Sequence, residues 1–119
     1  MSKILLVDDD DDMVKISSRW LEKAGYEVTT ANSGKDALSL LAGVKPDLVI
    51  LDYAMPEMTG PEVFEAIKAD PAYKNTPVLF RTGVNDASAA EIEEKLHPEG
   101  IVLKSEGKPV LLEAISRIL

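Results

Sequence analysis

Short apolar runs alternate along this chain with segments in which apolar residues recur every three or four positions. An unbroken apolar run is typical of a strand covered on both faces of a parallel sheet, and the longer spacing is typical of an amphipathic helix. The runs predict strands at 4–7, 48–51, 77–82 and 101–103, and a short alternating segment predicts a further strand at 26–30. The periodic segments predict helices at about 13–24, 33–43, 61–70, 86–96 and 110–119.

Five successive pairs of strand and helix predict an α/β fold, a single doubly wound sheet of five parallel strands with helices on both faces. The run Tyr26–Thr30 alternates between apolar and polar residues, which suits an edge strand. Sheets of this kind commonly have the strand order 2-1-3-4-5. In that order the connections between strands run in opposite directions along the sheet on either side of strands one and three, and ligands bind at the carboxyl ends of the strands there.

Local signals predict where several helices begin and end. Asp10–Asp12 supply an acidic cap and first turn to the first helix, and Gly25 suits the position just past its end. Ser33 and Asp36 form a capping-box-like start to the second helix, which we expect to end at Gly43. The first helix is expected to bury a stripe of apolar residues, Met13, Ile16, Trp20, Leu21 and Ala24.

The composition narrows the class of protein. With 119 residues, 45% of them hydrophobic, the chain is long enough for one domain with its own core. It has no cysteine, which excludes disulfides and thiolate metal sites, and no apolar run approaches the roughly 18 residues of a membrane span. A strand follows directly on Met1–Lys3, so we expect no signal peptide and a cytoplasmic protein. The net charge of −8 argues against direct nucleic-acid binding and suits a basic partner or a site that collects cations.

Polar side chains stand at the carboxyl ends of four predicted strands. They are Asp8 and Asp9 after the first strand, Asp52 after the third, Thr82 at the end of the fourth and Lys104 after the fifth. The predicted topology brings these side chains together at one edge of the sheet. Clustered carboxylates repel one another unless a cation is present, and an all-oxygen set suits Mg²⁺ with water and phosphate as further ligands.

This set of residues fits the chemistry of phosphoryl transfer. An aspartate can accept a phosphoryl group as an acyl phosphate, a lysine ammonium binds phosphate as a point charge, and a threonine hydroxyl can donate to a phosphoryl oxygen. Each residue also has an ordinary structural explanation. Asp8 to Asp12 could simply cap a helix, Thr82 could be a plain strand residue, and Lys104 could be a surface lysine. Their joint occurrence at one sheet edge favours the site.

From Lys3 to Leu119 the chain resembles the response-regulator receiver domain of two-component signalling, which has a flavodoxin-like fold. The resemblance rests on four motifs in order, residues 4–9 (ILLVDD), residues 51–60 (LDYAMPEMTG), Thr82-Gly83 and Lys104. Together these motifs are specific, whereas any one of them alone would not be. The resemblance implies a single receiver domain over residues 1–119.

The resemblance also implies a role for each acidic residue. Asp52 looks like the phosphoacceptor. Asp9 and Asp52 would bind Mg²⁺ through their side chains, Ala54 through its backbone carbonyl, and Asp8 through water.

Further roles follow from the same resemblance. Thr82 and Lys104 would contact the phosphoryl group. The donor would be a phosphohistidine on a sensor histidine kinase or a histidine phosphotransfer protein, and an output protein would recognise the altered surface. The domain would be a monomer or weak dimer, would contact neither nucleic acid nor membrane, and would not turn over external substrates.

Some positions depart from the family's usual residues. Ser105 follows the lysine where the family usually has a proline, and a cis bond before a non-proline residue costs about 2.5–4 kcal/mol. Ile101 occupies the position of the family's aromatic switch residue, while Ala54 and Val84 stand where polar residues often flank the site. Arg81 is unusual in a central strand, and we expect its side chain to reach the surface.

Two other functions remain open on the sequence. A phosphatase-type enzyme with an aspartyl intermediate would typically have a second acid two residues after its nucleophile, where this chain has Ala54. A receiver-like interaction module that no longer cycles phosphate is compatible with Ile101 and Ser105. The first would hydrolyse phosphate esters, and the second would not be phosphorylated at all.

Overall fold

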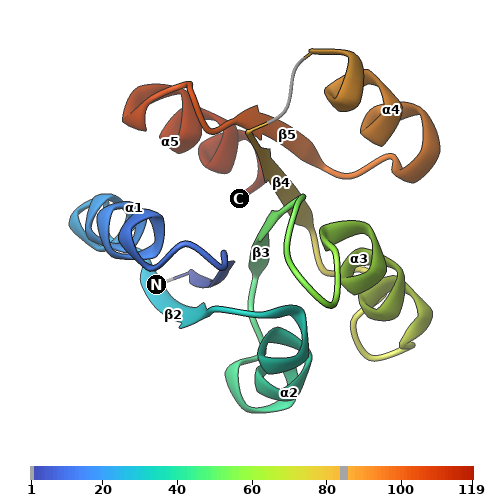
Figure 1. Ribbon diagram of the computed structural model, residues 1–119. Coiled ribbons are helices and arrows are strands. Elements are labelled where there is room, and N and C mark those ends of the chain that lie inside the picture. Colours follow the sequence, from blue (N-terminus) through green and yellow to red (C-terminus); the bar gives the residue numbers. More distant parts are fainter. Residues whose placement is uncertain (1, 84–85) are drawn as a thin grey trace.

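The computed structural model describes residues 2–83 and 86–119, and it describes the side chains of 2–83 and 91–119. Within these residues five strands form one parallel sheet in the order β2-β1-β3-β4-β5 (Figure 1). The strands are β1 (Lys3–Val7), β2 (Glu27–Ala31), β3 (Leu48–Asp52), β4 (Val78–Thr82) and β5 (Gly100–Leu103). The helices that follow them are α1 (Asp11–Lys23), α2 (Gly34–Val44), α3 (Gly60–Ala69), α4 (Asp86–Leu96) and α5 (Lys108–Ile118). The predicted fold class and strand order are therefore confirmed.

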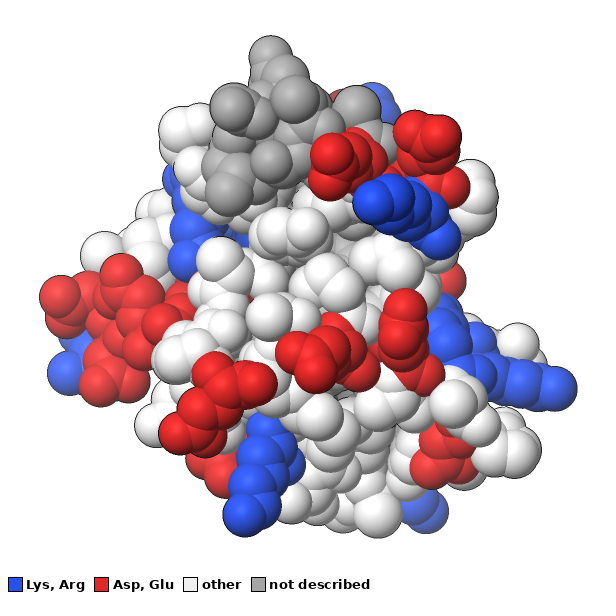
Figure 2. All heavy atoms as spheres, turned by 45° about the vertical axis from the view of Figure 1, so that its right-hand side comes forward, with Lys and Arg blue, Asp and Glu red and all other residues white. Residues whose placement is uncertain are grey.

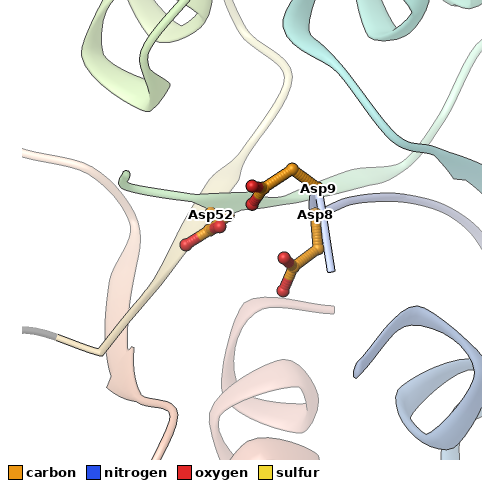
Figure 3. A group of neighbouring side chains, drawn as sticks. All are labelled: Asp8, Asp9 and Asp52. Atoms are coloured by element: carbon orange, nitrogen blue, oxygen red, sulfur yellow. The ribbon is translucent and has the colours of Figure 1, made fainter. Parts of the chain in front are cut away.

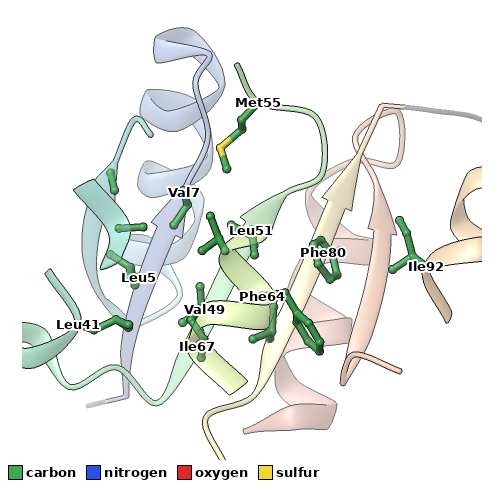
Figure 4. Close-up of a cluster of buried hydrophobic side chains, with 14 residues drawn as sticks. Leu5, Val7, Leu41, Val49, Leu51, Met55, Phe64, Ile67, Phe80 and Ile92 are labelled. Atoms are coloured by element: carbon green, nitrogen blue, oxygen red, sulfur yellow. The ribbon is translucent and has the colours of Figure 1, made fainter. Parts of the chain in front are cut away.

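Helices cover both faces of the sheet because its central strands are apolar on both sides. On one face Leu51 and Phe80 belong to a buried cluster that includes residues of α2, α3 and α4 (Figure 4). On the other face Ile50 and Leu79 pack with residues of α1 and α5. Burial of each side chain of this size stabilises the folded protein by about 1.5–3 kcal/mol relative to an exposed side chain. No helix in the described part of the chain is both long and apolar enough to cross a bilayer.

The strand register brings the carboxyl ends of the strands to one edge. Val7 is the Cα partner of Leu51, and Asp52 is the partner of Arg81. The backbone N–H of Lys104 donates to the carbonyl of Thr82 at 2.7 Å, which joins the ends of β4 and β5. The polar residues that follow these strands are consequently neighbours.

The start of α1 agrees with the predicted cap but lies slightly earlier in the chain. The carboxylate of Asp10 accepts hydrogen bonds from the backbone N–H groups of Asp12 and Met13 at 3.0 and 3.2 Å. The helix begins at Asp11 rather than near Met13. Gly25 follows the helix with a φ of 98°, a left-handed conformation that glycine adopts without steric cost.

The end of α2 differs from the prediction. The helix continues one residue past Gly43, and Lys45 forms its left-handed cap with a φ of 51°. A glycine inside a helix costs only about 1 kcal/mol, whereas the residue before a proline is disfavoured in the helical conformation. Pro46 therefore ends the helix, and Gly43 does not. The predicted cap at the start of α2 is present, since the N–H of Asp36 donates to Oγ of Ser33 at 3.1 Å, and a complete capping box occurs at the start of α3 between Thr59 and Glu62.

The predicted buried stripe of α1 was wrong at two positions. Ile16 is 45% exposed and Ala24 is exposed, whereas Leu21 is fully buried as expected. The inward side of the helix passes through Ser17 and Leu21, which are one turn apart. Ser17 takes the inward position because its hydroxyl accepts a hydrogen bond from Arg81 in β4.

Candidate functional site

Three carboxylates converge at the carboxyl edge of the sheet (Figure 3). Asp8 and Asp9 directly follow β1, and Asp52 is the last residue of β3. One oxygen of each carboxylate lies within 4.8 Å of the others. Asp8 and Asp52 are each only 3% exposed, while Asp9 is exposed. Because all donors are carboxylate oxygens and one side faces solvent, the group suits a hard cation such as Mg²⁺.

Lys104 lies against two of these carboxylates. Its Nζ is 3.0 Å from Oδ2 of Asp8 and 3.2 Å from Oδ2 of Asp52. The lysine is half-buried, directly after β5. Its ammonium group therefore compensates part of the negative charge that the sheet edge collects.

The protonation of Asp52 depends on these neighbours. Burial, followed by the charge of Asp8, raises the pKa of Asp52 to about 7, although the charge of Lys104 acts to lower it. Burial acts to lower the pKa of Lys104, but its hydrogen bond to Asp8 and the charge of Asp52 outweigh burial, so the net shift is upward. The lysine remains charged, and Asp52 is only partly ionised near neutral pH.

Backbone contacts hold the carboxylates in position. The N–H of Asp10 donates to Oδ1 of Asp8 at 3.0 Å, so the turn that starts α1 orients this side chain. The N–H of Gly60 donates to the carbonyl of Tyr53 at 2.9 Å. A Cβ on Gly60 would lie 2.3 Å from the backbone oxygen of Asp52, so only glycine allows the loop after β3 to fold back this closely.

The other predicted site residues lie around this centre. Thr82 is fully buried at the end of β4, and Ala54 is exposed two residues after the end of β3. Ile101 is half-buried and packs against the cluster beneath α4. The bond before Ser105 is trans, since no cis peptide occurs in the described residues. Val84 lies outside the described residues.

Arg81 was expected to reach the surface, and that expectation was wrong. The side chain is only 2% exposed, and its Nη1 donates to Oγ of Ser17 at 2.6 Å. Arg81 stands two residues after Leu79 in β4, so the two side chains lie on the same face, which α1 and α5 cover. Those helices leave no route to solvent. The signal available in the sequence was a lone charged residue inside an apolar run.

Comparison with known proteins decides the family. The family model described as "Response regulator receiver domain" matches residues 4–116. The chain belongs to the response regulator receiver family. Among solved structures, this receiver domain is similar to the chemotaxis protein CheY4 of Vibrio cholerae, with 34% identity and a TM-score of 0.92 over 100% of this chain and 99% of that chain. It is also similar to the signal receiver domain of a histidine kinase from Syntrophus aciditrophicus, with 27% identity and a TM-score of 0.91 over 100% of this chain and 90% of that chain.

The similar curated proteins are longer than this receiver domain. It is 39% identical over 108 residues to the "Probable cyclic di-GMP phosphodiesterase" of Vibrio cholerae. The aligned part is 91% of this chain and 24% of that protein. It is 30% identical over 115 residues to the CAI-1 autoinducer sensor kinase/phosphatase CqsS of the same organism. The aligned part is 96% of this chain and 17% of that protein. The chain thus spans about a quarter or less of these relatives.

Membership of the family agrees with the geometry of the site. Receiver domains are signalling modules of two-component systems, and they typically bind Mg²⁺ at an acidic pocket. Asp8, Asp9 and Asp52 form an acidic group of this kind here.

Proposed function

We propose that this receiver domain accepts a phosphoryl group on Asp52 in a Mg²⁺-dependent reaction. The observation that carries the proposal is the ammonium group of Lys104, which contacts both Asp8 and Asp52 beside the acidic group. A cation held next to the acceptor oxygen offsets the charge that a phosphoryl group brings. The exposed carboxylate of Asp9 leaves the site accessible to a donor.

The transfer requires an ionised Asp52. One carboxylate oxygen of Asp52 forms a P–O bond with the phosphoryl group of a phosphohistidine, the P–N bond breaks, and the imidazole keeps the electron pair. Asp9, Asp52 and the carbonyl of Ala54, with Asp8 through water, would hold Mg²⁺. When bound, Mg²⁺ supplies positive charge that favours the ionised carboxylate and neutralises phosphoryl oxygens.

Two residues next to the acceptor complete the proposed site. Lys104 would exchange part of its contact with the carboxylates for a contact with the phosphoryl oxygens. Thr82 would donate its hydroxyl hydrogen to another phosphoryl oxygen. Because both residues lie at the ends of neighbouring strands, a change at the site would alter the surface that β4 and β5 support.

The proposed partners are a sensor histidine kinase or phosphotransfer protein and an output protein. The likeness to a protein named as a sensor kinase/phosphatase supports this class of partner. On the face shown in Figure 2, acidic side chains form a dense group at one edge, while basic side chains lie mostly at the rim. With a net charge of −8, the domain suits partners with basic surfaces. The cytoplasmic location, the monomeric or weakly dimeric state and the lack of turnover on external substrates stay predictions.

Intact-mass measurement after incubation with acetyl phosphate and Mg²⁺ tests the proposal. The wild-type domain should gain the mass of one phosphoryl group, and Asp52→Asn should gain none. Asp47→Asn is the matched control, because the Asp47 carboxylate accepts a hydrogen bond from the N–H of Lys3, at the other end of β1 from the site. This control should be phosphorylated like the wild type. An acid- and base-labile phosphate on Asp52→Asn would contradict the assignment, and an unmodified wild type would favour the interaction module.

A further inference from the structure

Arg81 is among the largest buried side chains of the described residues, yet its charge has no partner in direct contact there. Its hydrogen-bond partner is the hydroxyl of Ser17, which is itself fully buried. Its Nε is buried without a hydrogen-bond partner in the described part of the chain. A buried charge normally requires compensation by an opposite charge. A neutral hydroxyl cannot supply it, so the compensation comes from more distant groups.

The alternation of side chains along the strands shows which groups these are. Asp52 follows Ile50 at the spacing of one sheet face, and Arg81 follows Leu79 at the same spacing. Asp52 and Arg81 are also Cα partners in the pairing of β3 with β4. Asp8 continues the same face from β1. Two buried carboxylates and the guanidinium therefore share the face that α1 and α5 cover.

The charges of these groups influence one another. Burial lowers the pKa of Arg81, while the carboxylates of Asp8 and Asp52 act to raise it. Arginine stays protonated under such conditions, so the guanidinium is a permanent charge. Lys104 contacts the same carboxylates from the solvent side, and Arg81 acts on them from the interior.

We propose that Arg81 is a positioning residue that acts as a fixed internal counter-charge of the site, weakening its affinity for Mg²⁺ and favouring the phosphorylated state. This inference rests on the proposed function. With Asp52 ionised, the three carboxylates and Lys104 alone carry two net negative charges, and Arg81 reduces this to one. A bound divalent cation is therefore repelled by Arg81, whereas the additional negative charge of an aspartyl phosphate is attracted. Opposite effects on a cation and an anion distinguish a charge from a packing role.

Two binding affinities test the inference, and amide NMR measures both of them. The first is for Mg²⁺ alone, and the second is for beryllofluoride, a phosphoryl mimic, at saturating Mg²⁺. Arg81→Gln should bind Mg²⁺ about tenfold more tightly and beryllofluoride about threefold more weakly, as expected for a unit charge beyond contact distance. Arg81→Lys keeps the charge and should stay within about twofold of the wild type in both measurements.

A double variant guards against misfolding. Arg81→Met with Ser17→Ala replaces both partners by apolar groups and leaves no hydrogen-bonding group unpaired. It should show the same opposite shifts as Arg81→Gln. Ser17→Ala alone keeps the charge and should change neither affinity by more than about twofold.

The outcomes separate this inference from the proposed function. A wild type that binds Mg²⁺ and beryllofluoride while the neutral variants match it would overturn the role of Arg81 and leave the proposed function standing. Weaker binding of both ligands by the neutral variants would show that Arg81 has a purely structural role and would also overturn its role as a counter-charge. A wild type that binds neither ligand would overturn both.

Discussion

The ammonium group of Lys104 lies 3.2 Å from Oδ2 of Asp52, so the residue proposed to accept phosphate already has a cation in contact. Asp52 ends β3 and Lys104 directly follows β5, and the two residues meet because β3, β4 and β5 end at the same edge. Lys104 also contacts Asp8 at 3.0 Å. This shared contact links the protonation of the acceptor to the lysine.

Removal of the Lys104 charge should raise the pKa of Asp52 further above its present value of about 7. Because the lysine favours the ionised carboxylate, Lys104→Gln should raise this pKa by about one unit. Carbon NMR of the side-chain carboxyl group measures the titration directly. Lys68→Gln is the control, since Lys68 pairs with Glu99 at 3.2 Å, at the opposite end of β4 from Thr82. An Asp52 titration that is equal in both variants would contradict the electrostatic account.

The raised pKa of Asp52 predicts a pH-dependent cost of folding. Between pH 3.8 and about pH 7, Asp52 in the folded protein keeps a proton that it releases in the unfolded chain. The free energy of unfolding therefore falls as the pH rises through this window, and the stability present below it is lost. Asp52→Asn carries no charge and should be more stable than the wild type by about 2–4 kcal/mol at pH 8 without Mg²⁺.

Urea unfolding at pH 4 and pH 8 measures this difference. The advantage of Asp52→Asn should shrink as the pH falls, because the wild-type carboxyl becomes protonated. Mg²⁺ should also reduce it at pH 8 by stabilising the wild type alone. Equal stability of the two proteins at pH 8 would show that burial of Asp52 carries no such cost.

The close approach of Gly60 to Asp52 predicts a large effect of a single methyl group. In Gly60→Ala the Cβ would meet the backbone oxygen of Asp52 at 2.3 Å and the Cα of Tyr53 at 2.8 Å, so the loop must shift. We expect a loss of about 2–4 kcal/mol in the free energy of unfolding. Gly43→Ala is the matched control, because no described atom apart from its two chain neighbours and the backbone of its own helix lies within 4 Å of its added Cβ. It should stabilise the protein by about 0.5–1 kcal/mol.

Chemical denaturation of both glycine variants compares them under identical conditions. The amide signals around residues 52–53 should move in Gly60→Ala and stay in place in Gly43→Ala. Similar stabilities in the two variants would mean that the loop after β3 adapts without strain.

Beryllofluoride should alter the surface near α4 and β5 without an aromatic side chain changing rotamer. Ile101 is half-buried and packs against the cluster that includes Ile92, so it can respond only by a modest packing shift. Amide shifts should concentrate in residues 91–97 and 101–104. Asp52→Asn is the control and should show no change with the same reagent. Unchanged signals in these segments with an occupied Asp52 would mean that the domain signals through another surface.

The order of the strands and helices along the chain and the position of the acidic site could both be predicted from the amino-acid sequence. Both depend on local patterns. The apolar run of β3 ends in Asp52 and that of β1 is followed by Asp8 and Asp9, and parallel strands of a doubly wound sheet end at a common edge. The resemblance to receiver domains rested on these same residues, and the match over residues 4–116 confirmed it.

The contacts that a side chain makes outside its own segment depend on how the helices and strands pack in the folded protein. Arg81 is buried rather than exposed because α1 and α5 close over its face of the sheet, which no pattern within β4 reveals. The same packing turns Ser17 inward and leaves Ile16 in solvent. Burial is set by the element that covers a residue, and contacts between distant segments exist only once the chain has folded. The charge balance beneath Asp52 is therefore a property of the assembled sheet and its helices.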